Sequence, residues 1–312
     1  MKINKNSKIF IAGHKGMVGS AIKKKLEQKG YKNIITIEKK KLNLIEQKKV
    51  FNYLQRIKPN LVILAAAKVG GIVANNSFKS QFIYENLQIQ NNIIHGSFRS
   101  GVKNLIFLGS SCIYPKLSKQ PIKEDYLLSG ALEKTNDAYA IAKIAGIKMC
   151  ENYNKSYGLN YRCLMPSNMY GPNDNYNLQN SHFFPALIRK IYEAKKFNKK
   201  KVVVWGSGKV LRELLYVEDL ADAVVFFINK RIKQSFINIG SGKDQTIRWY
   251  SKFIMKQIGV KLKIVYDKSK PDGVPRKLLD IRLAKKYGWT YKTSLKEGLK
   301  KTLLDFKSGF RK

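Results

Sequence analysis

The amino-acid sequence predicts an α/β protein with a doubly wound, mainly parallel sheet and a smaller, interleaved α/β domain for a substrate. In the first half of the chain, short apolar runs alternate with stretches of helical periodicity, as strands joined by helical crossovers do. Several apolar runs are unbroken, which is typical of strands covered on both faces. After Pro166 this alternation gives way to Asn- and Gly-rich loops, shorter helices and short strands.

The expected elements follow in chain order. In the first half, strands are expected at 8–12, 34–37, 61–66, 105–108 and 161–165, and helices at 19–30, 45–57, 78–99 and 137–157. In the second half, helices are expected at 182–196, 217–229, 247–258 and 294–306, and strands at 202–205, 236–239 and 262–266. We expect residues 1–172 and 212–235 to form a Rossmann-type dinucleotide-binding domain, and residues 173–211 and 236–312 to form the substrate-binding domain.

The chain is strongly basic, with 312 residues, a formal net charge of +39 and a pI of about 10.0. Such a charge suggests nucleic-acid binding, but a nucleic-acid reader gathers its lysines on one stripe with interleaved aromatics. Here they are spread along the sequence, for example at 23–25, 39–41 and 199–201. We interpret them as a solvated surface, with no specific nucleic-acid partner. Its field attracts anions such as diphosphates.

The three cysteines, Cys112, Cys150 and Cys163, form no even-numbered framework and lack metal-site spacing. They favour a reducing compartment, so we expect a cytoplasmic protein without a bound metal. No apolar run approaches the roughly 20 residues of a membrane span, and no secretory signal pattern opens the chain. Cys150 and Cys163 lie on an expected apolar helix face and in an expected strand, and we expect both in the core.

A glycine-rich turn lies between the first expected strand and the first expected helix. It reads Gly13-His14-Lys15-Gly16-Met17-Val18-Gly19. Glycines at this spacing permit a tight turn and let backbone N–H groups approach a pyrophosphate at the helix N-terminus. A glycine triplet alone is weak, but its place between a strand and a helix predicts dinucleotide binding.

Two signals near the end of the second expected strand bear on the choice between NAD and NADP. Glu38 would hydrogen-bond a free ribose 2′-hydroxyl and favour NAD, whereas Lys39 and the two lysines after it would favour a 2′-phosphate. Lys15 in the glycine turn adds a further cation at that end. We therefore expect NADP rather than NAD.

A second group of residues follows the expected strand at 105–108. Ser110 and Ser111 leave its carboxyl end, the edge at which open parallel sheets bind ligands. Tyr139 and Lys143 then lie on one face of an expected helix, where an ammonium beside a phenol would lower the phenol pKa. Tyr-x-x-x-Lys occurs three times in the chain, but only this copy follows a serine pair at a strand end. A tyrosine of this kind can protonate a carbonyl oxygen during reduction.

These features resemble the extended short-chain dehydrogenase/reductase family. The longer stretches 10–22, 64–76, 108–116 and 271–280 are similar to those members that epimerise and reduce a GDP-linked keto-deoxy sugar. The resemblance covers nearly the whole chain. It implies NADP-dependent conversion of GDP-4-keto-6-deoxy-D-mannose, by epimerisation at carbons 3 and 5 and reduction at carbon 4, in a homodimer.

The resemblance also implies residue roles. Ser110, Tyr139 and Lys143 would form the reductase triad, and Cys112 and His182 the acid/base pair for epimerisation. The cofactor would contact the turn from Gly13 to Gly19, Lys39, Leu108, Gly109, Ser110, Ser111, Lys143, Pro166, Asn168, Met169 and His182. The substrate would contact Lys190, Trp205, Arg212 and Asp272. The family pattern has Arg at the position of Lys190, and lysine keeps the charge but loses the bidentate fork.

Other interpretations of the same residues stay open. From the residues alone, Cys112 is more often a small buried residue. Arg212 could equally be a charge on a helix surface, and Trp205 could be a core residue. The chain could also be a GDP-sugar reductase or epimerase acting on a related keto-sugar nucleotide. A more distant possibility is a non-catalytic nucleotide- or RNA-binding protein, against which the Ser110, Tyr139 and Lys143 set argues.

Overall fold

A six-stranded parallel sheet forms the larger part of the structure, a computed structural model that describes residues 2–230 and 232–310. Its strands are β1 (Ile9–Ala12), β2 (Ile34–Thr36), β3 (Leu61–Leu64), β4 (Asn104–Leu108), β5 (Asn160–Pro166) and β9 (Phe236–Ile239). They lie in the order β2-β1-β3-β4-β5-β9, and every neighbouring pair is parallel. The chain runs outward from β1 to β2 and then returns past β1 to β3. The carboxyl ends of β1 and β3 therefore form the topological switch point, where such sheets bind ligands.

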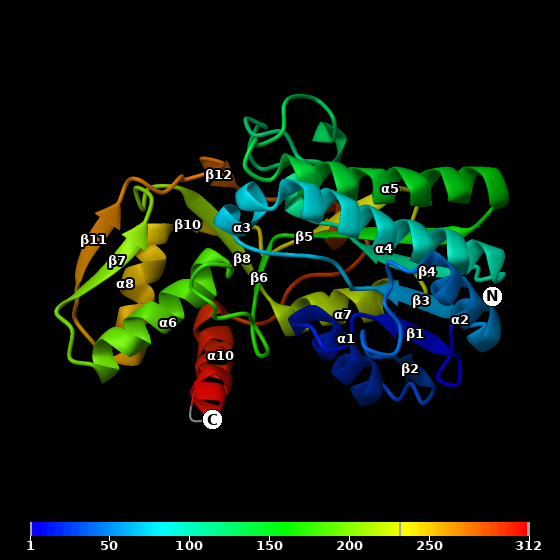
Figure 1. Ribbon diagram of the computed structural model, residues 1–312, viewed down its shortest axis with the longest axis horizontal. Coiled ribbons are helices and arrows are strands. Elements are labelled where there is room, and N and C mark those ends of the chain that lie inside the picture. The colour runs from blue at the N-terminus through cyan, green and yellow to red at the C-terminus, as the bar shows by residue number, and fades with distance from the viewer. Residues whose placement is uncertain (1, 231, 311–312) are drawn as a thin grey trace.

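Helices cover both faces of this sheet (Figure 1). On one face lie α1 (Met17–Gln28) and α7 (Val217–Phe227), and on the other lie α2 (Gln47–Ile57), α4 (Lys79–Arg99) and α5 (Asp137–Tyr157). Alternate residues of each strand point to opposite faces. Ile9 and Ile11 therefore pack in one hydrophobic cluster with α1 and α7, while Phe10 packs in a second one with α2, α4 and α5. The predicted α/β class with a parallel, Rossmann-type sheet is confirmed.

The smaller part is built around β8 (Leu211–Tyr216). This strand pairs with β6 (Asn168–Tyr170) and β12 (Arg276–Lys277) in parallel, and with β10 (Asp244–Thr246) antiparallel. A separate parallel pair joins β7 (Lys201–Trp205) to β11 (Lys263–Asp267). The helices α6 (Phe183–Lys196), α8 (Ile247–Ile258) and α10 (Leu295–Phe310) share a third hydrophobic cluster with these strands. The remaining short elements are α3 (Ile72–Ser77), α9 (Arg282–Lys286) and two single 3-10 turns, η1 (Ser111–Ile113) and η2 (Glu124–Tyr126).

The sheet topology departs from the expected domain boundaries in two places. β9 completes the six-stranded sheet beside β5, although residues from 236 onward are expected in the substrate-binding domain. β8 belongs to the smaller sheet, although residues 212–235 are expected in the dinucleotide-binding domain. β8 thus belongs to the smaller part, whereas α7 and β9, which follow it in the chain, belong to the larger part. The interpretation of Arg212 as a helix-surface charge is wrong, because Arg212 lies in β8 opposite Gln245 and Lys277.

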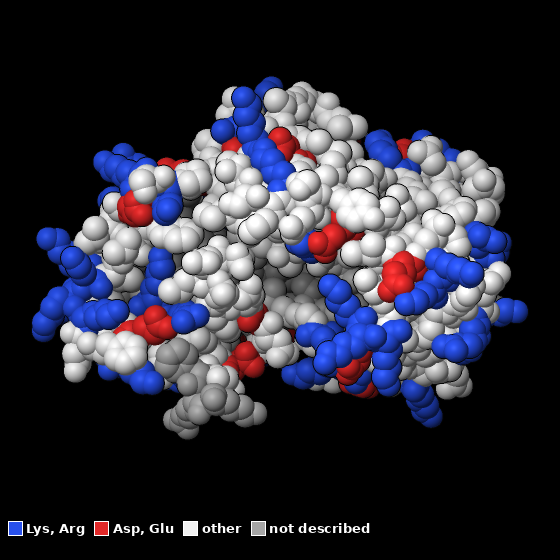
Figure 2. Space-filling view, viewed as in Figure 1, with Lys and Arg blue, Asp and Glu red and all other residues white. Residues whose placement is uncertain are grey.

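Lysine and arginine side chains are spread over both parts of the face shown in Figure 2 and do not form a single stripe. This distribution agrees with a solvated basic surface. None of the helices in the described residues is long and apolar enough to cross a membrane. Within the same residues, no group of three or more His, Cys, Asp or Glu side chains is placed to hold a metal ion.

Glu213 on β8 joins three segments of the smaller part. Its side chain is fully buried, and its two carboxylate oxygens accept from the backbone N–H groups of Gly242 at 2.7 Å and Leu279 at 2.8 Å. Burial raises the pKa of Glu213 to about 7, against the hydrogen bonds that lower it. The carboxyl group therefore holds two segments against β8: the turn after β9, through Gly242, and the chain just after β12, through Leu279.

Replacing Glu213 with Ala is expected to lower the free energy of unfolding by about 2–3 kcal/mol, because two N–H groups lose their acceptor. The folded pKa lies above the unfolded one, so the folded state binds more protons between about pH 4.5 and pH 7. The contribution of Glu213 to stability is complete below this range and falls as the pH rises through it. Urea unfolding should therefore show a larger gap between wild type and variant at pH 5 than at pH 8. If the difference in unfolding free energy between wild type and variant grows with rising pH, the role assigned to Glu213 is wrong.

Candidate active site

The glycine turn after β1 is closely packed. Gly13 has a φ of +95°, and a Cβ there would lie 2.6 Å from the backbone nitrogen of Ala66. A Cβ at Gly19 would lie 2.1 Å from the carbonyl oxygen of Gly13. Gly16 is the N-cap of α1, so the N-terminus of α1 opens at the switch point beside this turn. The turn fits a dinucleotide, since a pyrophosphate can approach the helix N-terminus along backbone without side chains.

Lys15 in this turn forms an ion pair with Glu38, which follows β2. Its Nζ lies 2.6 Å from the Glu38 carboxylate, and both side chains are largely exposed. The hydrogen bond and the charge of Lys15 lower the pKa of Glu38. Lys39 is exposed beside them. The acidic residue that would favour NAD is thus already engaged by a cation from the glycine turn.

Tyr139 and Lys143 lie on one buried face of α5, next to the carboxyl end of β4. Lys143 Nζ donates to the carbonyl oxygen of Leu108 at 2.8 Å, the last residue of β4. Ser110, two residues further, caps η1, where its Oγ accepts from the Cys112 N–H at 3.2 Å. The structure therefore brings Ser110, Tyr139 and Lys143 together, with both helix residues less than a tenth exposed.

The expectation that Lys143 lowers the phenol pKa is wrong for this arrangement. Burial raises the pKa of Tyr139 well above 10, against a lowering hydrogen bond from Ser110. Burial also lowers the pKa of Lys143 to about 7. The ammonium donates to Leu108 and lies 4.7 Å from the centre of the Phe107 ring, closer than its 5.8 Å to the Tyr139 ring. Tyr139 therefore carries its proton at neutral pH, as a proton donor must.

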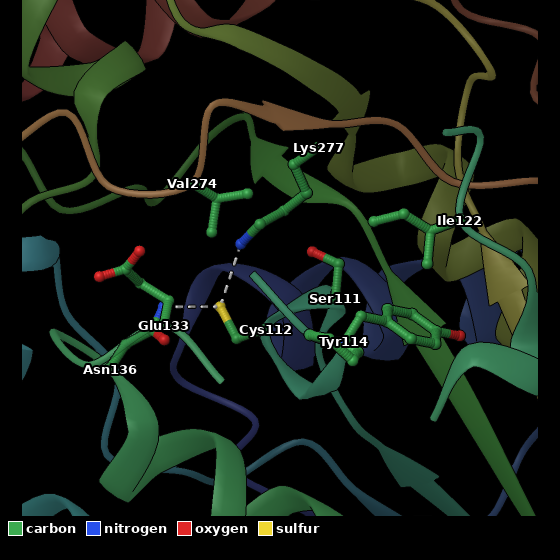
Figure 3. Close-up of a pocket in the computed structure, with 9 residues that line it drawn as sticks. Ser111, Cys112, Tyr114, Ile122, Glu133, Asn136, Val274 and Lys277 are labelled. Atoms are coloured by element: carbon green, nitrogen blue, oxygen red, sulfur yellow. Dashed lines mark hydrogen bonds between the residues drawn. The ribbon is translucent and has the colours of Figure 1, made fainter. Parts of the chain in front are cut away.

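Cys112 lies between two hydrogen-bond donors, as Figure 3 shows. Its Sγ accepts from Lys277 Nζ at 3.3 Å and from Asn136 Nδ2 at 3.4 Å. Burial raises the pKa of the thiol, but the charge of Lys277 and hydrogen bonds from Ser110 and Lys277 outweigh it, so the pKa lies below its usual value. A lowered pKa increases the share of thiolate, the form that acts as a base.

Sequence reasoning missed Lys277 and Asn136. Both are set by tertiary structure: Lys277 lies in β12, and Asn136 is the N-cap of α5. A signal for Lys277 was present, because it lies in the stretch 271–280, but nothing local in the sequence indicates that it reaches Cys112.

His182 is the N-cap of α6, where part of the residue reaches solvent while protein groups surround the imidazole. Desolvation by the surrounding protein lowers its pKa, and the charge of Lys277 lowers it further. The imidazole is therefore neutral at pH 7. Lys277 thus influences both Cys112 and His182, although they lie in different parts of the fold.

The four expected substrate residues form two neighbouring groups. Arg212 Nη2 donates to the carbonyl oxygen of Asp272 at 2.9 Å, while an Asp272 carboxylate oxygen accepts from the Ser207 N–H at 2.8 Å. Lys190 Nζ lies 4.7 Å from the centre of the Trp205 ring and donates to the Val203 carbonyl at 3.1 Å. The two groups meet at Gly206, the residue after Trp205. A Cβ at Gly206 would lie 2.3 Å from the Asp272 carboxylate.

The remaining expected cofactor residues lie at the ends of β4, β5 and β6. Leu108 pairs with Leu164 across β4 and β5, and the Gly109 N–H donates to Leu164 at 2.9 Å. A Cβ at Gly109 would lie 2.2 Å from Met165 Sδ, so the end of the Met165 side chain would have to shift to admit one. Pro166 ends β5, Asn168 and Met169 open β6, and Ser111 lies in η1 beside Cys112. Leu108, Gly109, Ser111 and Pro166 lie at or just after the carboxyl ends of β4 and β5, and Asn168 and Met169 continue from β5 into the smaller sheet.

Comparisons with known proteins agree with this geometry. Residues 9–240 match the model of the NAD dependent epimerase/dehydratase family, and the chain belongs to this family. It is 50% identical to the GDP-L-fucose synthase of Escherichia coli K12 over 304 residues, 95% of each chain. A GDP-6-OMe-4-keto-L-xylo-heptose reductase from C. jejuni has a TM-score of 0.92 and 35% identity, covering 99% of this chain and 100% of that one. A GDP-L-fucose synthetase from Naegleria fowleri, solved with NADP bound, has a TM-score of 0.90 and 27% identity, covering 100% and 96%.

Replacing Lys277 with Met is expected to raise the pKa of the Cys112 thiol, because the variant removes the ammonium that favours the thiolate. The rate of alkylation by iodoacetamide, followed against pH, measures this pKa directly. Cys150 and Cys163 are fully buried, so the signal comes from Cys112. If the alkylation rate of the variant rises over the same pH range as that of wild type, Lys277 does not act on the thiol.

Proposed function

We propose that this protein converts GDP-4-keto-6-deoxy-D-mannose to GDP-L-fucose, by epimerising carbons 3 and 5 and then reducing the 4-keto group with NADPH. The observation that carries the proposal is the presence of two proton-transfer groups at one sheet edge. Tyr139 with Ser110 and Lys143 suits reduction, and Cys112 with Lys277 suits proton abstraction from carbon. Relatives named GDP-L-fucose synthase, half identical over nearly the whole chain, support the same substrate.

Epimerisation follows from the acidity that a 4-keto group confers on the hydrogens at carbons 3 and 5. Cys112, as a thiolate favoured by Lys277, accepts one such proton, and the electron pair passes to the 4-oxygen as an enolate. Ser110 and Tyr139 stabilise this oxyanion by hydrogen bonds. His182 delivers a proton to the opposite face of the carbon. Because the free imidazole is neutral at pH 7, His182 must take up a proton from solvent before it delivers one.

Reduction uses the same ketone after both centres have inverted. When bound, NADPH supplies the hydride to carbon 4. Tyr139 donates its proton to the 4-oxygen, and its raised pKa keeps that proton in place until the alkoxide forms. Ser110 orients the carbonyl oxygen. Lys143 holds its position on the Leu108 carbonyl, beside the Tyr139 ring and the end of β4.

The turn from Gly13 to Gly19, at the switch point, would hold the pyrophosphate of the cofactor. The Lys15–Glu38 pair supports NADP over NAD, since it neutralises the carboxylate that would repel a 2′-phosphate. Lys39 adds positive charge beside that position. The residues that would hold the nicotinamide end are Leu108, Gly109, Ser111, Pro166, Asn168 and Met169.

The GDP group of the substrate binds in the smaller part. Lys190 and Arg212 attract its diphosphate, and Trp205 offers a ring face beside them. Asp272 orients the guanidinium of Arg212 through its backbone oxygen. The high positive charge of the chain adds a general attraction for this doubly phosphorylated ligand.

The protein acts as a cytoplasmic homodimer that pairs α4 and α5 of two copies. Large apolar side chains on these helices support this arrangement, because Tyr84, Ile141 and Tyr157 are each about half exposed. The three free cysteines support a reducing compartment.

The proposal is tested by incubating the purified protein with GDP-4-keto-6-deoxy-D-mannose and either NADPH or NADH. Loss of the reduced nicotinamide absorbance, with GDP-L-fucose as the product, is the expected result, and NADPH should be the faster cofactor. Failure of both cofactors with this substrate would overturn the assignment.

A second candidate is a GDP-sugar 4-reductase that does not epimerise. The likeness to the C. jejuni reductase favours it. The same incubation separates the two, because a simple reductase yields a 6-deoxy sugar with unchanged configuration at carbons 3 and 5.

A further inference from the structure

The segment Gly70–Ser77, here called the bridging segment, follows β3 and contains α3. It belongs to the larger part of the fold but contacts the smaller part in two places. The Gly71 N–H donates to the Asn180 carbonyl at 2.9 Å. The Ile72 Cδ1 lies against Gly273, where a Cβ would be 3.0 Å from it. These contacts reach the chain immediately before His182 and the residue next to Asp272.

The bridging segment also touches the catalytic tyrosine. Ala74 and Tyr139 share a small apolar cluster with Phe82 of α4, and Cys112 packs against this cluster. The rings of Phe82 and Tyr139 meet edge to face with their centres 6.4 Å apart. One short segment therefore contacts both the reductase residue and the loop that carries His182.

Gly71 is the closest point of this contact. A Cβ there would lie 2.3 Å from the carbonyl oxygen of Ser181 and 3.1 Å from its carbonyl carbon. Its φ of −68° and ψ of 180° are open to any residue, so the close approach, and not the backbone conformation, requires glycine. Ser181 directly precedes His182, so any displacement of this backbone moves the imidazole.

Asn75 holds Gly71 in place from within the segment. Its side chain is 7% exposed, and its Nδ2 donates to the carbonyl oxygens of Gly70 at 2.7 Å and Gly71 at 3.0 Å. The Asn75 N–H also donates to Gly71 at 3.0 Å. With its carbonyl fixed in this way, the Gly71 peptide directs its N–H at Asn180.

We propose that Gly71, fixed by Asn75, is a positioning residue that sets the place of His182 relative to Cys112 and so controls epimerisation. The inference rests on the proposed function and assigns a role to the stretch 64–76, which the mechanism above does not use. His182 delivers a proton during epimerisation, whereas the proton for reduction comes from Tyr139. Disturbing Gly71 therefore separates the two halves of the reaction.

Replacing Gly71 with Ala is the direct test. Exchange of solvent deuterium into carbons 3 and 5 of the substrate, without cofactor, is expected to slow by about 10–100-fold, as displacements of roughly 1 Å do. Oxidation of GDP-L-fucose by NADP⁺, which reports the reductase half alone, is expected to slow much less than the exchange does. The control is Gly130→Ala, whose Cβ would meet Pro115 at an ordinary 3.4 Å. Asn75→Ala, which adds no bulk, is expected to give a smaller effect in the same direction.

Histidine NMR tests the positioning without any substrate, because the chain has only three histidines. In Gly71→Ala the pKa of His182 is expected to rise toward its usual value of about 6.5, because the imidazole is less desolvated and lies further from Lys277, while the signals of His14 and His95 stay in place. If the wild-type protein neither exchanges nor oxidises these sugars, the proposed function fails. The His182 signal then still shows whether Gly71 positions the imidazole. An unchanged His182 signal, or equal loss of exchange and oxidation at an unchanged melting temperature, would overturn the inference.

Discussion

Replacing Tyr139 with Phe is expected to slow NADPH oxidation by about 10²–10⁴-fold, because the variant removes the phenol that protonates the 4-oxygen in the proposed mechanism. Epimerisation should persist, since Cys112 and its contact with Lys277 remain. Steady-state oxidation of NADPH and deuterium exchange at carbons 3 and 5, measured on the same preparation, separate the two activities.

Phenylalanine is a close control for packing in this variant. It keeps the ring that meets Phe82 edge to face and removes only the hydroxyl group. The melting temperature should therefore change little. A variant that reduces the ketone at the wild-type rate would show that another group, or water, supplies the proton.

Replacing Cys112 with Ala is expected to slow deuterium exchange at carbons 3 and 5 by about 10²–10⁴-fold, because the base that removes the carbon-bound proton is lost. Reduction of the ketone continues through Tyr139. The product mixture, resolved by NMR, should shift from GDP-L-fucose toward an unepimerised GDP-6-deoxy sugar.

Oxidation of GDP-L-fucose by NADP⁺ is the control for the Cys112 variant, because it needs no epimerisation. Its rate should stay close to that of wild type, which shows that the site is still assembled. Unchanged exchange in the variant would mean that Cys112 is a packing residue and that its hydrogen bond from Lys277 has no catalytic role.

The larger sheet was predictable because its signals are local. Unbroken apolar runs such as 61–66 report burial on both faces, and the glycine turn reports a close backbone approach that the structure confirms at Gly13 and Gly19. Expected helices such as 137–157 and 247–258 match α5 and α8. Strong periodicity and clear helix ends made these boundaries visible in one sequence.

The smaller part was less predictable because its strands are defined by distant partners. Leu211–Tyr216 carries two charged residues among leucines, a pattern that suits a helix as well as a strand. Only pairing with β6, β10 and β12 makes it β8. Glu213 and Arg212 then take roles that no local pattern indicates, one as a buried acceptor and the other beside Asp272.

The chemistry of the site was also predictable only where its signals are local in the sequence. The i,i+4 spacing of Tyr139 and Lys143 correctly indicates a shared helix face, but it does not report how deeply that face is buried. Burial reverses the expected direction of the phenol pKa. Lys277 reaches Cys112 from more than 160 residues away in the sequence, so only the folded chain reveals the pair.

The central claim is that one site both epimerises and reduces the same ketone. The most direct test is conversion of GDP-4-keto-6-deoxy-D-mannose with unlabelled NADPH in D₂O, followed by NMR of the product sugar. The proposed mechanism predicts GDP-L-fucose with deuterium at carbons 3 and 5 and ordinary hydrogen at carbon 4. A reduced product without deuterium at carbons 3 and 5, and with their configuration unchanged, would contradict it.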